Sequence, residues 1–385
     1  MKIFHINSNY IYSSLHNELV NKLKLLEIEN TIFVPVYDKE HGLSFDDDDI
    51  NVEKCFSKWD RLSFFKKQKK IIKSAEQKFN GLKQVDIIHA YTLFTDGNCA
   101  MNLSKKYGIP YVVAVRNTDI NVFFKYMIHL RKKGIEILKN ASAVFFLSQP
   151  YRDIVIKKYV PQKLRTAILD KTYIIPNGIN DFWFEHMFYR DSERIWEKIV
   201  GEKTIRVVYA GEIDKNKNIN LTVDALKRMR IEGWKVYFNA IGKVKEEKVL
   251  KKCQKYDFFH HFDAIPKESL IEYYREADVF VMPSHRETFG LVYAEAMSQG
   301  LPVIYTRGQG FDKQFEDGMV GYSVDANNPD ELKKLLELVL DRYKEVSTNA
   351  LKYVEKFRWL QIAKMYKNIY IHLTEHEKPI KEVKY

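Results

Sequence analysis

The chain of 385 residues lacks any hydrophobic run of the roughly 18 residues that a membrane-spanning helix requires. Its first residues, 1–7, are typical of a first β-strand and are too short and too polar for a signal peptide, so we expect a cytoplasmic protein. Cysteine is scarce, because Cys55, Cys99 and Cys253 are the only three. Their number and wide spacing indicate a reducing compartment and exclude a disulfide framework and a cysteine-based zinc site.

Glycine and proline are also few, at 16 and 10 residues, and neither an internal repeat nor a low-complexity block occurs. A chain of this length exceeds one typical hydrophobic core, so two domains are expected. Strand and helix patterns alternate before and after a Pro-Asn-Gly turn at 176–178. We therefore expect an α/β fold with two Rossmann-like, doubly wound domains that face a cleft and bind ligands at the carboxyl ends of their strands.

The net charge of +11 is concentrated in the first half of the chain. Residues 1–176 hold 28 Lys and Arg against 18 Asp and Glu, a balance of +10. This asymmetry indicates an anionic partner, such as a membrane surface, a nucleic acid or a phosphate-rich acceptor, or else an ordinary solvated surface. Residues 38–60 are loop-like, and their run of four acids at 46–49 is not expected to bind a metal, because adjacent side chains point in alternating directions.

Two basic helices are predicted in this half. In the helix expected over 61–79, Leu62, Phe65, Ile72 and Phe79 can share one side while lysines crowd the rest. That composition suits either an anionic bilayer surface or simple packing on the first domain. The second basic helix is expected over 122–139.

The most informative stretch lies at 279–305. An apolar run at 279–282 predicts a buried strand, a loop with Gly290 near its end follows, and a helix begins at Leu291 and ends at Gly300 and Pro302. A second apolar run then predicts the next strand. The loop would leave free backbone N–H groups at a helix N-terminus, where anions bind.

Two glutamates flank this loop. Glu287 lies in the loop and Glu295 lies roughly one turn into the helix, so both can face the same crevice. Taken alone, Glu287 could also be merely solvated and Glu295 an ordinary acid on the helix surface. The surrounding residues decide between these readings.

The stretch 283–303 resembles the signature of the retaining family-4 glycosyltransferases, which have the GT-B fold. That signature carries two glutamates separated by seven residues, and Glu287 and Glu295 match it. Four further segments resemble the interdomain hinge, the donor-phosphate loop, the start of the final helix of the C-terminal domain, and the helix that crosses back: 176–179, 211–218, 327–332 and 357–359. The similarity covers 176–375 closely and the rest more loosely. The ordered set is far more specific than the glutamate pair.

The resemblance implies an N-terminal acceptor-binding domain over 1–176, onto which 360–385 cross back, and a C-terminal nucleotide-sugar-binding domain over 177–359. It implies transfer of a hexose-type sugar, with retention, from a nucleotide-diphosphate sugar, UDP-sugar being favoured. The acceptor would be a glycan, a lipid-linked molecule or a polymer in cell-envelope polysaccharide or glycoconjugate synthesis. The basic first half favours a peripheral position at the inner face of a membrane. No metal or other cofactor is implied, since cationic groups and helix N-termini would stabilise the leaving diphosphate.

The resemblance also implies residue roles on the donor side. Lys217 would pair with the diphosphate as a mobile point charge, and the N–H groups of Gly290 and Leu291 would hold a phosphate. Glu295 would accept hydrogen bonds from the ribose and Glu287 from the donor sugar. The donor-binding set is Gly211, Glu212, Lys217, Ile265, Glu287, Phe289, Gly290, Leu291 and Glu295.

The sequence departs from the family pattern at two charged positions. Glu212 stands where an arginine is usual, and Arg116 stands where a histidine is usual. We hypothesise that Arg116 supplies the missing positive charge, which makes Glu287, Arg116 and Lys217 the catalytic residues. Alternatively, Glu212 and Arg116 form a salt bridge across the cleft.

The acceptor side is less well defined, because serines replace the usual glycine pair after the first strand. The acceptor-binding residues that we expect are Ser13, Ser14, His89, Asn117 and Asp119. For His89, a purely structural role is an equal alternative. Two other functions stay open: a catalytically silent relative that binds a sugar nucleotide or a glycan, and a GT-B sugar-nucleotide epimerase. A nucleic-acid binder is disfavoured, since no groove-reading motif accompanies the charge.

Overall fold

The computed structural model describes residues 1–38, 49–82 and 84–375, and the chain divides into two compact units. Unit 1 consists of Met1–Leu147, Tyr151–Asn177 and Trp359–Tyr385, and unit 2 consists of Ser148–Pro150 and Gly178–Arg358. The division expected from the sequence differs from these bounds by one residue at 176–178 and at 358–360, and it did not separate 148–150 from the first unit.

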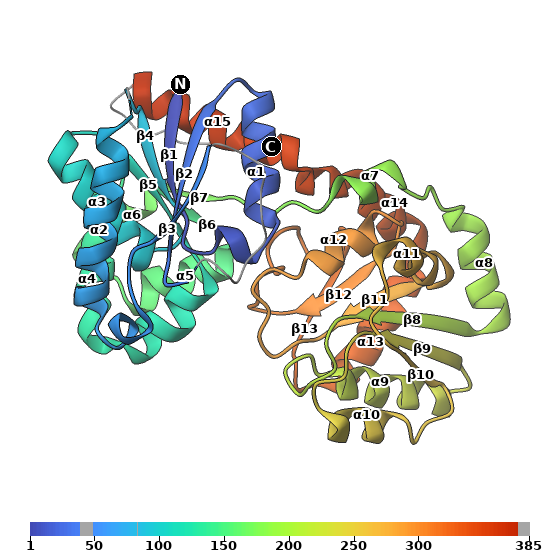
Figure 1. Cartoon of the computed structure of the whole chain (residues 1–385). Helices are drawn as coiled ribbons and strands as arrows, with labels where there is room; N and C mark the ends of the chain where they lie inside the picture. The colour runs from blue at the N-terminus through green and yellow to red at the C-terminus, as the bar shows by residue number, and fades with distance from the viewer. Residues whose placement is uncertain (39–48, 83, 376–385) are drawn as a thin grey trace. The chain divides into compact units, whose positions relative to one another are not determined.

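Within its described residues, unit 1 contains a parallel seven-stranded sheet in the order β3-β2-β1-β4-β5-β6-β7 (Figure 1). Its strands are β1 (Lys2–Ile6), β2 (Glu29–Val36), β3 (Ile50–Lys54), β4 (Ile87–Ala90), β5 (Tyr111–Val115), β6 (Ala143–Phe146) and β7 (Thr172–Ile174). Its helices are α1 (Leu15–Leu25), α2 (Phe64–Asn80), α3 (Thr95–Tyr107), α4 (Arg131–Asn140), most of α5 (Gln149–Lys158), α6 (Gln162–Leu169) and α15 (Trp359–Glu375). Four shorter helical turns are η1 (Tyr10–Tyr12), η2 (Lys58–Leu62), η3 (Asp119–Phe124) and η4 (Ile128–Leu130).

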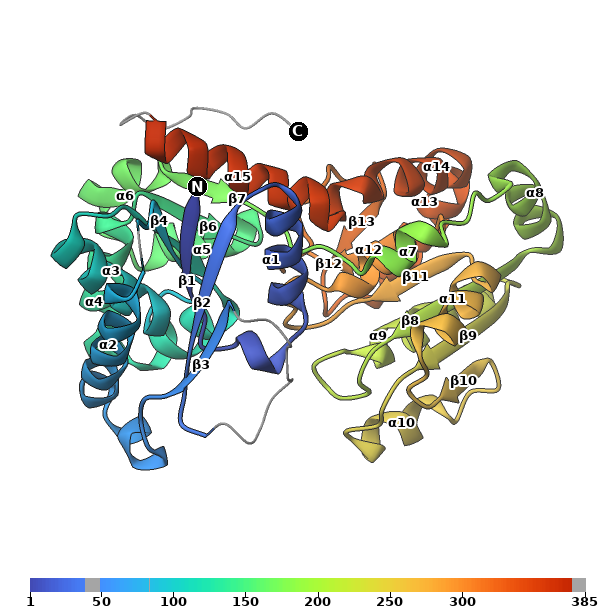
Figure 2. The same cartoon turned by 45° about the horizontal axis from the view of Figure 1, so that its top comes forward.

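Helices cover both faces of this sheet. Successive strand residues point to opposite faces, so apolar strands place buried side chains on both sides. Ile3 and Ile87 pack in one core layer with residues of α1 and α15, whereas Phe4 and Ile88 pack in the other with residues of α2, α3 and α4. Figure 2 shows α15 running alongside the sheet next to α1. The helix α15 is therefore part of the core of unit 1.

Unit 2 contains a parallel six-stranded sheet in the order β10-β9-β8-β11-β12-β13. Its strands are β8 (Thr204–Ala210), β9 (Lys235–Ile241), β10 (Phe259–Phe262), β11 (Val279–Met282), β12 (Val303–Thr306) and β13 (Gly321–Val324). Its helices are α7 (Asp181–Glu185), α8 (Ser192–Glu202), α9 (Ile219–Ile231), α10 (Glu247–Cys253), α11 (Lys267–Glu276), α12 (Leu291–Met297), α13 (Pro329–Asp341), α14 (Tyr343–Tyr353) and the short η5 (Val354–Phe357). The predicted α/β class with two doubly wound sheets is confirmed.

Each sheet reverses its strand order at one point. In unit 1 this point lies between β1 and β4, and in unit 2 it lies between β8 and β11. The loops that leave the two central strands diverge there, which opens a crevice at the carboxyl edge of a doubly wound sheet. The order of the strands thus selects the loops that can form a site in each unit.

Strand β3 contradicts the loop expected over 38–60. Ile50 and Val52 alternate with polar residues, pair with β2 and pack against its core layer, so a short edge strand forms despite the acidic run before it. Residues 46–48 of that run lie outside the described residues. Asp49 forms an ion pair with Lys24, with Nζ and Oδ2 2.9 Å apart.

The apolar side predicted for the helix over 61–79 is partly wrong. The α-helix begins at Phe64 and buries Gln68, Ile71, Ala75 and Phe79. Leu62 belongs instead to the turn η2 and is 84% exposed, and Phe65 lies ahead of the first buried residue of α2 and is 59% exposed. A capping box between Ser57 and Asp60 begins the separate turn η2, and α2 starts only after Ser63.

The second basic helix, expected over 122–139, is broken into η3, η4 and α4. The backbone at Met127 leaves the helical region, with ψ at 66°. The carboxylate of Asp119 fixes the start of η3 by accepting backbone N–H groups from two other segments of unit 1. None of the helices in the described parts of the chain is long and apolar enough to cross a membrane.

Gly310 offers a test of how tightly the loops of unit 2 are packed. A Cβ atom at this position would lie 1.9 Å from the carbonyl oxygen of Thr288, so Gly310→Ala must push two loops apart. We expect a loss of about 1–3 kcal/mol in the free energy of unfolding, measured by urea titration and circular dichroism. Gly201→Ala is the control, since a Cβ in that helical position meets no atom within 4 Å and should be neutral or stabilising. Equal stability of both variants would contradict the close approach.

Candidate functional site

The loops that follow β8, β11 and β13 in unit 2 are tied together by asparagines. Asn218 adopts a left-handed backbone conformation with φ at 57°, and its side-chain Nδ2 donates to the carbonyl oxygens of Pro283 and Ala326 at 3.1 and 2.8 Å. Asn216 donates from its Nδ2 to the carbonyl of Arg286 at 3.0 Å. These bonds join 211–218 to the loop after β11, across the point where the strand order reverses.

An ion pair spans these two loops. The Lys217 Nζ lies 2.6 Å from Glu287 Oε2, and the two side chains are only 22% and 12% exposed. The backbone of Lys217 is fixed by its N–H, which donates to Asp214 Oδ1 at 2.8 Å. The backbone of Glu287 is fixed by its N–H bond to Gln309 Oε1 and by its carbonyl, which accepts from Gly310. A cation and an anion are therefore held side by side at the carboxyl edge of the sheet.

Glu295 lies in α12, the helix that follows the Glu287 loop, and its side chain is partly buried. Burial raises the pKa of Glu295 to about 7, although Lys267 and a hydrogen bond from Trp183 act in the opposite direction. Gly290 caps the start of α12 with φ at 77°, a conformation that favours glycine. The first N–H groups of α12 have no acceptors within the helix, as at any helix start.

The other residues of the expected donor set are placed as follows. Phe289 is buried and packs against Phe311 and Phe357, so it can reach a ligand only through its backbone. Glu212 is exposed, and its carboxylate lies 3.3 Å from the Nζ of Lys245 within unit 2. Gly211 follows β8 directly, and Ile265 is partly exposed in the segment between β10 and α11. The negative charge of Glu212 is therefore balanced by Lys245 of the same unit.

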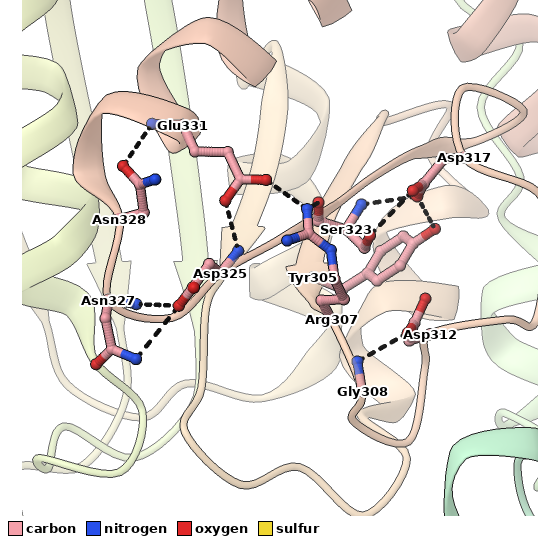
Figure 3. Close-up of polar contacts among 10 residues, drawn as sticks. All are labelled: Tyr305, Arg307, Gly308, Asp312, Asp317, Ser323, Asp325, Asn327, Asn328 and Glu331. Carbon is pink, nitrogen blue, oxygen red and sulfur yellow. Dashed lines mark hydrogen bonds and ion pairs between the residues drawn. The ribbon is translucent and has the colours of Figure 1, made fainter. Parts of the chain in front are cut away.

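Figure 3 shows further acids in the loops around β12 and β13 and in the first turn of α13, and their carboxylates contact neighbouring protein groups. The Asp317 carboxylate accepts from the N–H and hydroxyl of Ser323 at 2.9 and 3.0 Å. Glu331 accepts from the N–H of Asp325 and pairs with Arg307. Within the described residues, no three His, Cys, Asp or Glu side chains converge in a way that could hold a metal ion.

Unit 1 has a pocket of its own at the carboxyl edge of its sheet. The cavity has a volume of about 460 Å³ and lies where the loops after β1 and β4 diverge. Its lining combines hydroxyl groups, aromatic rings and one cation: Ser8, Asn9, Tyr12, Pro35, Val36, Tyr37, Phe56, Lys67, Thr92, Thr95, Thr118, Asp119 and Phe123. Such a mixture suits a ligand with hydroxyl groups on an apolar ring.

Asp119 holds the wall of this pocket. Its buried carboxylate accepts backbone N–H groups from Leu93, Phe94 and Arg116 at 2.9, 3.2 and 2.8 Å. Burial raises the pKa of Asp119 to about 6, and these hydrogen bonds limit the rise. Asp119 thus acts first as a support for two loops. The Arg116 Nε donates to the carbonyl of Tyr91 at 3.2 Å, which places its guanidinium beside the same loops.

The remaining residues of the expected acceptor set differ in their access to a ligand. His89 has no exposed surface, its Nδ1 lies 2.7 Å from the Tyr370 hydroxyl, and it packs inside unit 1. Ser13 and Ser14 lead into α1, and the Ser13 hydroxyl accepts from the N–H of Leu15. Asn117 accepts a hydrogen bond from Asn121. These residues are held in place by local contacts, and none of the four lines the pocket.

Sequence reasoning missed Ser8, Thr92 and Thr95, which line the pocket. Ser8 and Thr92 come two residues after the ends of the buried strands β1 and β4, and Thr95 begins α3. The position just after a buried strand was the available signal for the first two. The pocket could not be assembled in advance, because it needs the order of β1, β2, β4 and β5 in the sheet.

Two family models match the chain. Residues 191–356 match the model described as Glycosyl transferases group 1, and residues 17–181 match the model described as Glycosyltransferase Family 4. Together the two matches span both units. The resemblance to family-4 glycosyltransferases noted in the sequence therefore holds in each half of the chain.

Individual proteins are similar over most of their length. An uncharacterized glycosyltransferase of Methanocaldococcus jannaschii is 24% identical over 297 residues, which is 76% of each chain. A D-inositol 3-phosphate glycosyltransferase of Paenarthrobacter aurescens is 26% identical over 299 residues, covering 72% of this chain and 70% of that protein.

Solved structures share the fold at lower identity. The lipopolysaccharide outer core galactosyltransferase WaaB superposes with a TM-score of 0.70 at 17% identity, covering 97% of this chain and 99% of the other. Sucrose-phosphate synthase from Thermosynechococcus elongatus gives 0.69 at 17% identity with the same coverage. HepE of Anabaena, in complex with UDP and glucose, gives 0.63 at 16% identity, covering 96% of this chain and 98% of that one.

Proposed function

Since the chain belongs to the group 1, family 4 glycosyltransferases, we propose that it transfers a hexose-type sugar with retention from a nucleotide-diphosphate sugar. The observation that carries this proposal is the Lys217–Glu287 pair at the carboxyl edge of unit 2. UDP is the favoured nucleotide, because the similar HepE structure contains it. We propose no metal, since the site offers a cation and helix N–H groups to the leaving diphosphate.

In this proposal the Lys217 ammonium group leaves Glu287 and pairs with the diphosphate when the donor binds. The Glu287 carboxylate, which also accepts from the N–H of Thr288, then accepts hydrogen bonds from the hydroxyls of the donor sugar. The N–H groups of Gly290 and Leu291 hold a phosphate oxygen, and Glu295 accepts from the ribose. As the bond to the anomeric carbon breaks, negative charge grows on the diphosphate, and Lys217 stabilises it most strongly at that moment.

The acceptor is proposed to bind unit 1, in the pocket that Ser8, Thr92 and Thr95 line. Its chemical class is a glycan, a lipid-linked molecule or a polymer, in the synthesis of a cell-envelope polysaccharide or glycoconjugate. Arg116 is proposed as the cation that unit 1 contributes, in place of the usual histidine. The basic balance of +10 over 1–176 favours work at the inner surface of a membrane.

The first test uses UDP-, GDP-, ADP- and dTDP-sugars. We expect one nucleotide series to raise the thermal unfolding temperature and one sugar of that series to release nucleotide slowly, with faster release once a suitable acceptor is added. Stabilisation without any release would indicate a silent binder, the alternative that Glu212 keeps open. No stabilisation by any sugar nucleotide would contradict the proposed function.

The Lys217–Glu287 pair predicts a matched pair of variants. Lys217→Ala should lower kcat by about 100-fold or more, because it removes the cation that stabilises the leaving diphosphate. Lys215→Ala is the control: Lys215 lies two residues away, is 78% exposed and pairs with Glu246. Its kcat should stay within about twofold of the wild type. Similar kcat values for the two variants would rule out the assigned role.

Glu295 predicts a pH dependence of nucleotide binding. Its pKa of about 7 lies above the usual 4.5, so the carboxylate is mostly protonated at pH 6 and mostly ionised at pH 8. Ribose hydroxyls donate to the ionised form, and the affinity for UDP should therefore fall about tenfold from pH 8 to pH 6. Because ionisation opposes folding, the same group should lower stability as the pH rises from about 5 to 7.

Calorimetric titration of UDP at both pH values measures this effect, and Glu295→Gln is the comparison. The variant should bind UDP weakly and with little change between pH 6 and pH 8. An equally steep pH dependence in the variant would show that another group is responsible.

A further inference from the structure

Unit 1 exposes large apolar side chains at the turn that leads into α2. Trp59 and Leu62, both in η2, are 81% and 84% exposed, and Phe65 in the first turn of α2 is 59% exposed. This is the blue turn ahead of α2 in Figure 2. Burial of such side chains in a folded protein is normally favourable, so their exposure calls for a partner that covers them.

A second segment beside it adds two more apolar side chains. The rings of Phe64 and Phe123 lie 6.1 Å apart and join the start of α2 to η3. A few residues further along the chain, Tyr126 and Ile128 are 67% and 65% exposed. We call Trp59, Leu62, Phe65, Tyr126 and Ile128 the apolar tips.

The turn that carries Trp59 and Leu62 is firmly held. The buried Asp60 carboxylate accepts from the N–H and hydroxyl of Ser57 at 2.8 and 2.9 Å and from the Lys70 Nζ at 2.6 Å. The backbone of η2 is therefore fixed from within. The outward direction of its two apolar side chains is built into the fold.

Lysines surround the apolar tips. The helix α2 contains six lysines and one glutamate, and the lysines at 66, 69, 70 and 73 are exposed. Lys58 in η2 and Lys125 beside Tyr126 are exposed as well. The patch thus combines protruding apolar groups with a strong positive charge, in the half of the chain that holds the +10 balance.

We infer that the apolar tips insert into the headgroup layer of an anionic lipid bilayer while the surrounding lysines contact lipid phosphates. Tryptophan and tyrosine favour this layer because one end of each ring system is apolar and the other is polar. Aliphatic tips such as Leu62 and Ile128 disfavour a nucleic acid, which would stack bases on aromatic rings. The inference deepens the proposed function by naming the surface that would meet a membrane-bound acceptor.

The test uses the full chain and vesicles that contain neither donor nor acceptor, so its outcome does not depend on the proposed transferase activity. Flotation with phosphatidylcholine vesicles is compared with flotation on 7:3 phosphatidylcholine and phosphatidylglycerol. We expect binding at least about tenfold tighter on the anionic vesicles, with partial loss at high salt. Brominated lipids should quench the fluorescence of Trp59. The difference in quenching between the wild type and Trp59→Phe measures this contribution.

Two variants separate insertion from charge. The triple variant Trp59→Ser, Leu62→Ser and Phe65→Ser should weaken binding to anionic vesicles about tenfold or more without a change in thermal unfolding, since these side chains are exposed. Its control is Tyr189→Ser with Ile231→Ser, which removes apolar side chains that are 78% and 85% exposed on unit 2. That control should bind as the wild type does.

The charge pair is matched in the same way. Lys69→Glu with Lys73→Glu should abolish most of the preference for anionic vesicles, whereas Lys248→Glu with Lys251→Glu, an equal charge change at exposed positions of unit 2, should not. Equal binding to neutral and anionic vesicles would overturn the inference, and so would undiminished binding by the triple variant. Tight binding of a single-stranded oligonucleotide that the triple variant loses would assign the surface to nucleic acid instead.

Discussion

Polar side chains hold the carboxyl-end loops of both units, and the architecture of each site depends on them. Loops at this edge have no strand ladder to satisfy their backbone groups, so side chains must do so. In unit 1, Asp119 accepts three backbone N–H groups from two loops. In unit 2, Asn218 donates to the carbonyls of Pro283 and Ala326 and so fixes the loop on which Lys217 stands.

The parts of the fold with local signals could be predicted from the sequence. Apolar runs bounded by glycine and proline gave β11 and the start of α12 at the observed residues, together with Glu287 and Glu295. The contact between Lys217 and Glu287 could not be predicted from spacing, because 70 residues separate them and the strand order brings them together. The resemblance to a family supplied that pairing of segments.

The sequence predictions that the structure contradicts share a physical cause. Strand β3 is short and lies at the edge of the sheet, where one neighbour decides whether it forms. The spacing of Leu62 and Phe65 in the sequence is that of residues on one apolar side of a helix. A side chain is buried, however, only where another layer of the protein lies against it, and both of these are exposed. Phe289 shows the reverse case, since its place in the donor motif gave no sign that its ring packs with Phe311 and Phe357.

The position of α15 has a consequence for the order in which the protein can fold during synthesis. Tyr366 and Tyr370 complete the core layer that Ile3 and Ile87 begin, although more than 350 residues of chain lie between the first and the last of these. A ribosome makes all of unit 2 before it makes that helix. Unit 1 therefore keeps the part of its sheet that α15 covers open to water until α15 has been made, which is after all of unit 2.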